Sequence, residues 1–342
     1  TQEYIKSLKQ CIILDNKFIP AFVSLADFKL DDSDKKIDIE KKIVNEIKIR
    51  KREGNQKDNA SLYFGLANYH HNNGTCDEAW EWLVSANKLV SSTASLDIDA
   101  YRKSRNDLLE FARSFEGGSA GAEPNRGKPR PVFILGASRS GKTLTERLLC
   151  MGTLTQTQAG YENNLTELAS QYASHQAGLL GIRRASALPS VLKDKFAFFY
   201  EKLLSQNCNS SEIYTTTSPG LISDVGIILQ TIPSCKFVFI KRNKLDLAFR
   251  IFGKYYKKEQ NMYSYDINSV IFEIDWYNSM IDTWINKFPE KCMLTNYSDI
   301  VSNTRGEIEK IAEFVGIKYE HVDDSNVSDD SGCSNPYQKH LK

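Results

Sequence analysis

A short apolar run leads directly into a glycine- and lysine-containing loop, and this combination restricts the fold of the 342-residue chain more than any other part of it. Residues 131–135 read Pro-Val-Phe-Ile-Leu, which is typical of a buried strand. Residues 136–143 follow as Gly-Ala-Ser-Arg-Ser-Gly-Lys-Thr, which satisfies the pattern G-x-x-x-x-G-K-T. Leu148 and Leu149 then indicate an amphipathic helix that begins near Thr143. We therefore expect a parallel α/β sheet with an anion site after this strand.

The loop itself carries the chemistry that an anion needs. A tight turn exposes successive backbone N–H groups, and the start of the following helix adds its positive end. Arg139 and Lys142 supply formal positive charge. The residues expected to hold a phosphate or phosphosulfate group are Arg139, Ser140, Gly141, Lys142, Thr143 and Leu144.

A second cationic segment follows a later strand. Residues 235–240 read as a buried strand, and the strand is followed by Lys241-Arg242. Nucleotide hydrolases need a carboxylate at such a strand end to help hold magnesium, whereas a cation there suits a second phosphate of the same nucleotide. A helix expected over 243–256 places Arg250 on the face that also carries Asp246. We expect Arg242 and Arg250 to bind that second phosphate.

The N-terminal third predicts an all-helical arm. Apolar residues recur at helical spacing in two short helices that Asp15-Asn16 separates, and a second helical hairpin turns at residues 72–74. The spacing of Leu62, Gly65 and Tyr69 resembles a tetratricopeptide repeat. We expect three parts, listed here in chain order: a tetratricopeptide-like helical domain over 1–115, a Gly- and Pro-rich linker over 116–130, and a P-loop α/β domain over 131–342.

Composition limits the class of protein. Lys plus Arg (44) and Asp plus Glu (43) nearly cancel, so no overall field attracts nucleic acid or an anionic membrane. The seven cysteines include no C-x-x-C pair, which favours the reducing cytoplasm over a secreted disulfide framework. No apolar run approaches the roughly 18 residues of a membrane helix. No spacing of His, Cys and carboxylates predicts a metal site.

These segments together resemble the sulfotransferases that use 3′-phosphoadenosine 5′-phosphosulfate (PAPS), in particular those fused to tetratricopeptide repeats. The usual first segment of that family reads P-R-S-G-T-T-L, and residues 138–144 match it except at Ser138 and Lys142. The usual second segment reads R-D-P-R-D, and residues 242–246 read Arg-Asn-Lys-Leu-Asp. The resemblance implies PAPS as cosubstrate, Arg242 and Arg250 as ligands of its 3′-phosphate, and no requirement for a metal.

The same resemblance implies a catalytic base and also shows two departures. Glu162 lies where related enzymes carry a glutamate that takes the acceptor's proton, after a strand expected over 153–159; His175 is the rival base. The family usually carries a lysine at the position that Thr217 occupies here. Because Lys142 replaces a threonine of the loop, we hypothesise that Lys142 supplies the missing positive charge in catalysis.

Two other functions stay open from the sequence. The literal G-x-x-x-x-G-K-T match favours a P-loop kinase or NTPase. Two features would suit a catalytically degenerate repeat scaffold. Thr217 stands where the family usually carries a lysine, and the polar tail over 325–342 lacks the family's usual end. The acceptor could be a small molecule, a glycan or a peptide, and the helical arm could dock a protein partner.

Overall fold

The structure, a computed structural model, describes residues 2–30, 37–53, 59–93, 96–117, 128–153, 156–208, 210–256 and 259–320. It divides into two compact units. The first contains the residues up to Tyr101 together with Lys244–Glu273, and the second contains Arg102–Asn243 and the described residues from Ile274 onward. Most of the expected linker over 116–130, and the whole tail over 325–342, lie outside the described residues.

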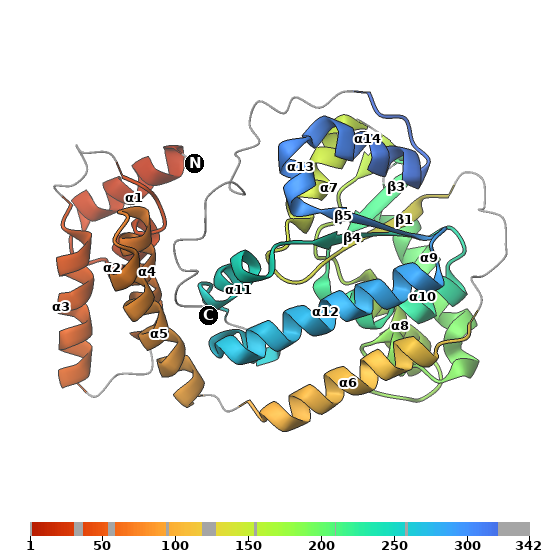
Figure 1. Ribbon diagram of the computed structural model, residues 1–342, viewed down its shortest axis with the longest axis horizontal. Coiled ribbons are helices and arrows are strands. Elements are labelled where there is room, and N and C mark those ends of the chain that lie inside the picture. Colours follow the sequence, from red (N-terminus) through yellow and green to blue (C-terminus); the bar gives the residue numbers. More distant parts are fainter. Residues whose placement is uncertain are drawn as a thin grey trace. The chain divides into compact units, whose positions relative to one another are not determined.

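The first unit is helical. It contains α1 (Gln2–Leu14), α2 (Ile19–Leu25), α3 (Ile39–Arg52), α4 (Ala60–Asn72), α5 (Cys76–Thr93), α11 (Lys244–Phe252) and the 3₁₀ segment η7 (Glu259–Tyr265). The predicted break at Asp15-Asn16 separates α1 from α2, and the predicted turn near Gly74 separates α4 from α5. Both helical hairpins are therefore confirmed, and Figure 1 shows α4 and α5 lying side by side.

Two apolar clusters hold this unit together. One joins the four helices α1, α2, α3 and α4 through side chains such as Phe22, Leu25 and Ile43. The other joins α4 and α5 to the segment that follows residue 243: Phe64 stacks on Tyr255 at 5.3 Å between ring centroids. The helix α11, which follows the second cationic segment, therefore shares a core with the helical arm.

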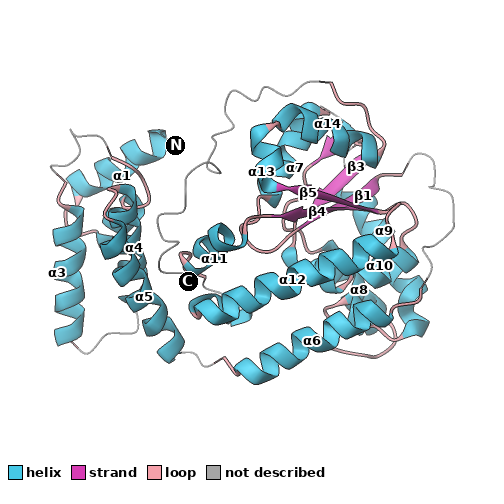
Figure 2. Cartoon of the chain, in the orientation of Figure 1, coloured by secondary structure: helices cyan, strands magenta, loops and turns pink. Residues whose placement is uncertain are grey.

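The second unit is built on a five-stranded parallel sheet (Figure 2). Its strands are β1 (Arg130–Leu135), β2 (Thr157–Gln158), β3 (Ile213–Thr216), β4 (Lys236–Lys241) and β5 (Cys292–Asn296), in the order β2-β3-β1-β4-β5. This confirms the predicted parallel α/β sheet. The strand expected over 153–159 was wrong in extent: of its described residues, Thr157 and Gln158 pair with β3, and Thr153 instead caps the preceding helix.

Helices cover both faces of the sheet (Figure 1). The helices of this unit are α7 (Lys142–Gly152), α8 (Leu165–His175), α9 (Lys193–Asn207), α10 (Val225–Thr231), α13 (Tyr297–Ser302), α14 (Thr304–Val315), and most of α6 (Ile98–Ser114) and α12 (Ile267–Lys287). Short 3₁₀ turns are η4 (Ala185–Ala187), η5 (Ser190–Leu192) and η6 (Pro219–Ser223).

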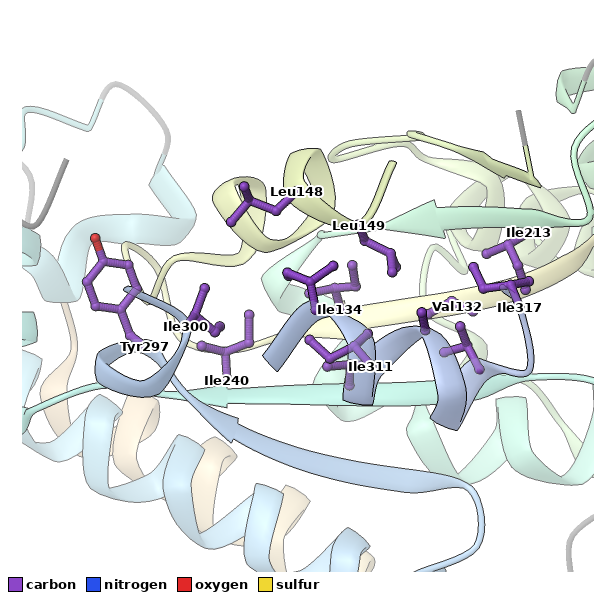
Figure 3. Close-up of a cluster of buried hydrophobic side chains, with 14 residues drawn as sticks. Val132, Ile134, Leu148, Leu149, Ile213, Ile240, Tyr297, Ile300, Ile311 and Ile317 are labelled. Atoms are coloured by element: carbon purple, nitrogen blue, oxygen red, sulfur yellow. The ribbon is translucent and has the colours of Figure 1, made fainter. Parts of the chain in front are cut away.

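Side chains alternate between the two faces, as a strand requires. Val132 and Ile134 of β1 point into a cluster with α7, α13 and α14 (Figure 3). Phe133 points to the opposite face, where it stacks on Phe237 at 4.9 Å between ring centroids and contacts Tyr200 of α9. Burial on both faces explains why β1 and β4 are continuous apolar runs.

The strand order places the site. From β1 the chain moves to β2 and β3 on one side, and then crosses to β4 and β5 on the other. Ligands of open parallel sheets bind where the order reverses in this way, at the carboxyl ends of the strands. The glycine- and lysine-containing loop follows β1 at that point. Within the described parts of the chain, none of the helices has the length and apolarity of a membrane span.

Candidate active site

The loop between β1 and α7 turns sharply over the end of β4. A Cβ atom added to Gly136 would lie 2.3 Å from the Ser140 Oγ and 2.7 Å from the Ile240 carbonyl oxygen. Only glycine fits there, because real side chains do not approach so closely. The backbone N–H of Ser140 donates to the Ala137 carbonyl, which closes the turn. Arg139 sits in the left-handed region at φ 66° and is exposed.

Two side chains of the loop are buried within it. The Lys142 ammonium donates to the Ala137 carbonyl at 2.9 Å. The Ser140 hydroxyl is fully buried and has no hydrogen-bond partner among the described residues. The first turn of α7 also presents backbone N–H groups that the helix itself does not satisfy. An orphaned hydroxyl beside these N–H groups fits a bound oxyanion.

The second cationic segment meets the loop. The Arg242 Nη1 donates to the Arg139 carbonyl oxygen at 3.2 Å. The guanidinium carbon of Arg242 also lies 3.8 Å from the centroid of the Tyr297 ring, which is a cation–π contact. Sheet register accounts for this meeting: Lys241 of β4 pairs with Asn296 of β5, so the residues that follow them emerge side by side.

Tyr297 also fixes the start of α7. Gly141 has φ 107°, and a Cβ atom there would lie 2.3 Å from Cδ2 of the Tyr297 ring. The ring therefore packs directly against the glycine of the loop. Figure 3 shows Tyr297 at one end of the buried cluster, near Ile300. One aromatic side chain thus contacts both the phosphate loop and Arg242.

The turn that carries Glu162 follows β2 at the same edge of the sheet. Gly160 lies against β3, since an added Cβ would come 2.2 Å from the Thr215 carbonyl oxygen. The Tyr161 carbonyl accepts from the backbone N–H of Thr217 at 2.9 Å and from the Thr216 hydroxyl at 3.1 Å. Glu162 itself is exposed. The turn is fastened to β3, and its carboxylate side chain reaches solvent.

A buried carboxyl group of α7 lies beneath this turn. Glu146 is fully buried, and its Oε1 accepts from the Thr215 hydroxyl at 2.6 Å and from the Tyr161 backbone N–H at 3.0 Å. Burial raises the pKa of Glu146 above its ordinary value, and hydrogen bonds from Thr215, Tyr161 and Gly160 partly offset that rise. Burial likewise raises the pKa of the neighbouring Cys150 thiol to about 12.

The other predicted residues differ in their surroundings. Arg250 belongs to the first compact unit, on α11, where its Nε donates to the Asp246 carboxylate at 3.0 Å. His175 ends α8, about 15 Å along the helix axis from the end that follows Glu162. Thr217 is buried, and its hydroxyl has no partner among the described residues. Thr143 is exposed and Leu144 half-buried in the first turn of α7.

Sequence reasoning missed Glu146 and Tyr297. Glu146 could have been suspected from its spacing, because it lies three residues before the buried Leu149 and four after Lys142, on the inner face of α7. Tyr297 gave no local signal, because its role depends on the pairing of β4 with β5. Among the described residues, no group of three or more His, Cys, Asp or Glu side chains is arranged to hold a metal ion.

Comparison with known proteins supports a family assignment. A profile described as "Sulfotransferase family" matches residues 131–321. An uncharacterized protein of Aquifex aeolicus (strain VF5) is 22% identical over 320 residues, which is 91% of this chain and 41% of that protein. The chain thus spans about two fifths of the length of this relative.

Several solved structures match part of this chain. They include the sulfotransferase domain of the curacin biosynthetic pathway (16% identity, 56% of this chain, 75% of that chain, TM-score 0.37) and a sulfotransferase from Alicyclobacillus acidocaldarius (13%, 57%, 83%, 0.39). A third is retinol dehydratase in complex with retinol and PAP (14%, 63%, 66%, 0.31). The profile covers more than half of the chain, and the chain belongs to the sulfotransferase family.

Proposed function

We propose that this protein transfers the sulfuryl group of PAPS to a hydroxyl or amine acceptor. The observation that carries the proposal is the contact between Arg242 and the carbonyl of Arg139 in the loop after β1. It brings two cationic segments, about a hundred residues apart in sequence, to one edge of the sheet. A nucleotide with phosphate groups at both its 3′ and 5′ ends matches such a pair of segments.

The loop residues would hold the 5′ end of the nucleotide. Arg139, Ser140, Gly141, Lys142, Thr143 and Leu144 supply the charge, the buried hydroxyl and the helix start. Arg242 would bind the 3′-phosphate. Arg250 stays a predicted second ligand of that phosphate, on the resemblance alone. When bound, PAPS supplies the sulfuryl group and a stable leaving group. Lys142 lies inside the loop, so its charge acts on the oxygens that the loop encloses.

Glu162 would take the acceptor's proton. Its side chain is exposed at the carboxyl edge, while hydrogen bonds from Thr216 and Thr217 hold the preceding residue in place. Because hydrogen bonds hold the turn, the carboxylate keeps its position, and because it is exposed, an acceptor can reach it. In-line transfer then needs little from the protein besides this base, positive charge and alignment.

The proposal extends to partners and location. The acceptor is a small molecule, a glycan or a peptide, and no feature of the sequence favours nucleic acid. The helical arm offers a surface to a protein partner. A cytoplasmic location is part of the proposal because the thiols of Cys11, Cys76, Cys150, Cys208, Cys235 and Cys292 are free.

Thermal shift with three nucleotide conditions tests the donor. Adenosine 3′,5′-bisphosphate (PAP), the desulfated product, should raise the melting temperature, because a ligand that binds only the folded state stabilises it. Mg·ATP should raise it less. A larger shift with Mg·ATP would support a P-loop kinase or NTPase, and no shift with either would support a scaffold without catalysis.

Radiolabelled PAPS tests the base. The Glu162→Gln variant should keep the PAP-induced shift and lose about a hundredfold or more in transfer to acceptors from a cell extract. The His175→Gln variant is the matched control, because it alters the rival base and should transfer as the parent does. Loss of transfer in the His175 variant alone would reassign the base.

A further inference from the structure

The buried carboxyl group of Glu146 joins two parts of the site that the sequence keeps separate. It belongs to α7, the helix that begins at the phosphate loop, and it lies four residues after Lys142. Its Oε1 accepts from the backbone N–H of Tyr161, the residue that directly precedes Glu162. The same oxygen accepts from the Thr215 hydroxyl of β3. One oxygen atom thus links helix, strand and turn.

The turn needs such a link because its backbone is not relaxed. Tyr161 has φ 51°, in the left-handed region that non-glycine residues rarely occupy. Its carbonyl accepts hydrogen bonds from Thr216 of β3 and from Thr217, which directly follows that strand, and its N–H donates to Glu146. The backbone of Tyr161 is therefore held at both its N–H and its carbonyl. This also fixes the direction in which the Glu162 side chain leaves the turn.

A salt bridge does not explain the burial of Glu146. Among the described residues, the groups that interact with the carboxyl are the Thr215 hydroxyl, the backbone amides of Gly160 and Tyr161, the Cys150 thiol and the Tyr214 hydroxyl, and none is a cation. Its Oε2 has no hydrogen-bond partner among the described residues. A buried carboxyl that lacks a charged partner costs stability, so a purely structural position would favour an apolar side chain.

We propose that Glu146 is a positioning residue: it accepts the Tyr161 N–H and thereby orients Glu162 with respect to the phosphate loop. The contribution comes from the geometry of its hydrogen bonds, and ionisation of the carboxyl is not required. This proposal rests on the proposed function where it concerns transfer. The hold on the turn itself is a property of the folded chain with or without any reaction.

Hydrogen exchange measures that hold directly. In Glu146→Ala the Tyr161 amide should exchange about tenfold faster or more, while the amides of β1 and β4 keep their protection and report an intact sheet. Glu146→Asp should behave in the same way, since its side chain is one methylene shorter and cannot reach both donors. Glu146→Gln should match the parent, because its amide oxygen can accept both hydrogen bonds. Glu309→Ala, which removes an exposed carboxylate of α14, is the control.

Binding and transfer measurements on the same variants complete the test. The affinity for PAP should stay within about threefold of the parent in every variant, while transfer from PAPS to 4-nitrophenol should fall about tenfold or more in Glu146→Ala and Glu146→Asp only. An unchanged Tyr161 exchange rate in Glu146→Ala would overturn the proposal. So would a Glu146→Gln variant as impaired as Glu146→Ala, or a loss of PAP affinity that parallels the loss of transfer.

Failure of the proposed function would look different. A parent protein that neither binds PAP nor transfers sulfuryl groups would refute the proposed function, while the exchange rates would still decide whether Glu146 holds the turn.

Discussion

At the scale of single residues, the site is organised by close approaches that only particular side chains allow. Gly136 lets the loop lie over the end of β4, and Gly141 lets it lie against the Tyr297 ring. The Tyr297 ring also contacts the Arg242 guanidinium. Stacking of a guanidinium on a ring limits its orientations, so Arg242 enters the site already aligned. The loop and the second cationic segment are thus joined before any nucleotide binds.

Gly141→Ala should therefore destabilise the protein. The added methyl would lie 2.3 Å from the Tyr297 ring, at a φ of 107° that disfavours alanine. Left-handed strain alone costs about 1–2 kcal/mol, and the clash adds to it. Urea unfolding should give a loss of about 2 kcal/mol or more. Gly220→Ala is the matched control, because an added Cβ there meets nothing within 4 Å. Equal stability of the two variants would contradict this reading of Tyr297.

Glu146 should also make stability depend on pH. Its pKa in the folded protein is raised by burial, so above the ordinary value of 4.5 the folded state binds more protons than the unfolded state. Stability from this group is therefore fully present below pH 4.5 and is lost as the pH rises through the raised pKa.

Comparison of Glu146→Gln with the parent isolates this effect, since all other titrating groups are shared. The variant's stability relative to the parent should rise from about pH 4 to about pH 8 in urea unfolding. A difference that stays constant with pH would show that Glu146 titrates normally.

At the scale of secondary-structure elements, the sequence predicted the parts that repeat a simple pattern. The apolar runs of β1 and β4 and the G-x-x-x-x-G-K-T loop gave the sheet and the helix start. The strand expected over 153–159 is present but shorter than predicted, because β2 is an edge strand with polar residues, and Thr157 and Gln158 are its described paired residues. The contact of Arg242 with the loop depends on the register of neighbouring strands, which no local pattern encodes.

One buried amide links the helical arm to α11. The Asn87 side chain of α5 donates to the Phe252 carbonyl at the end of α11, at 3.1 Å, and to the Leu83 carbonyl at 2.8 Å. The Phe252 carbonyl belongs to the last turn of its helix and has no partner farther along it. Asn87→Ala should cost about 1–3 kcal/mol in chemical unfolding. Lys88→Ala, at an exposed position of the same helix, should be neutral. Equal stabilities of the Asn87→Ala and Lys88→Ala variants would show that the Asn87 hydrogen bonds do not stabilise the protein.

At the scale of the whole molecule, the arm and the segment over 244–273 form one compact unit. Phe64, Leu83 and Ala86 from the arm share a cluster with Phe252 and Tyr265. The helical arm thus packs, through apolar side chains, on residues 244–273, which directly follow the second cationic segment. We therefore expect the arm to be needed for the folded state of that segment.

A fragment that lacks the arm should accordingly fold poorly. Residues 116–342 would expose the side of α11 and η7 that packs on α4 and α5. Exposed apolar surface of this kind promotes association, so the fragment should bind the dye ANS and aggregate while the full chain does neither. A monodisperse fragment with no dye binding would show that the segment is stable without the arm.

The central claim is that Arg242 and the loop after β1 serve the two phosphorylated ends of one nucleotide. Calorimetric titration with PAP and with adenosine 5′-monophosphate, which lacks the 3′-phosphate, tests it most directly. The parent should bind PAP about ten- to a hundredfold more tightly, and Arg242→Ala should lose that preference while Arg305→Ala, at an exposed position of α14, keeps it. Equal affinities of the parent for the two nucleotides, or a preference that survives in Arg242→Ala, would contradict the account.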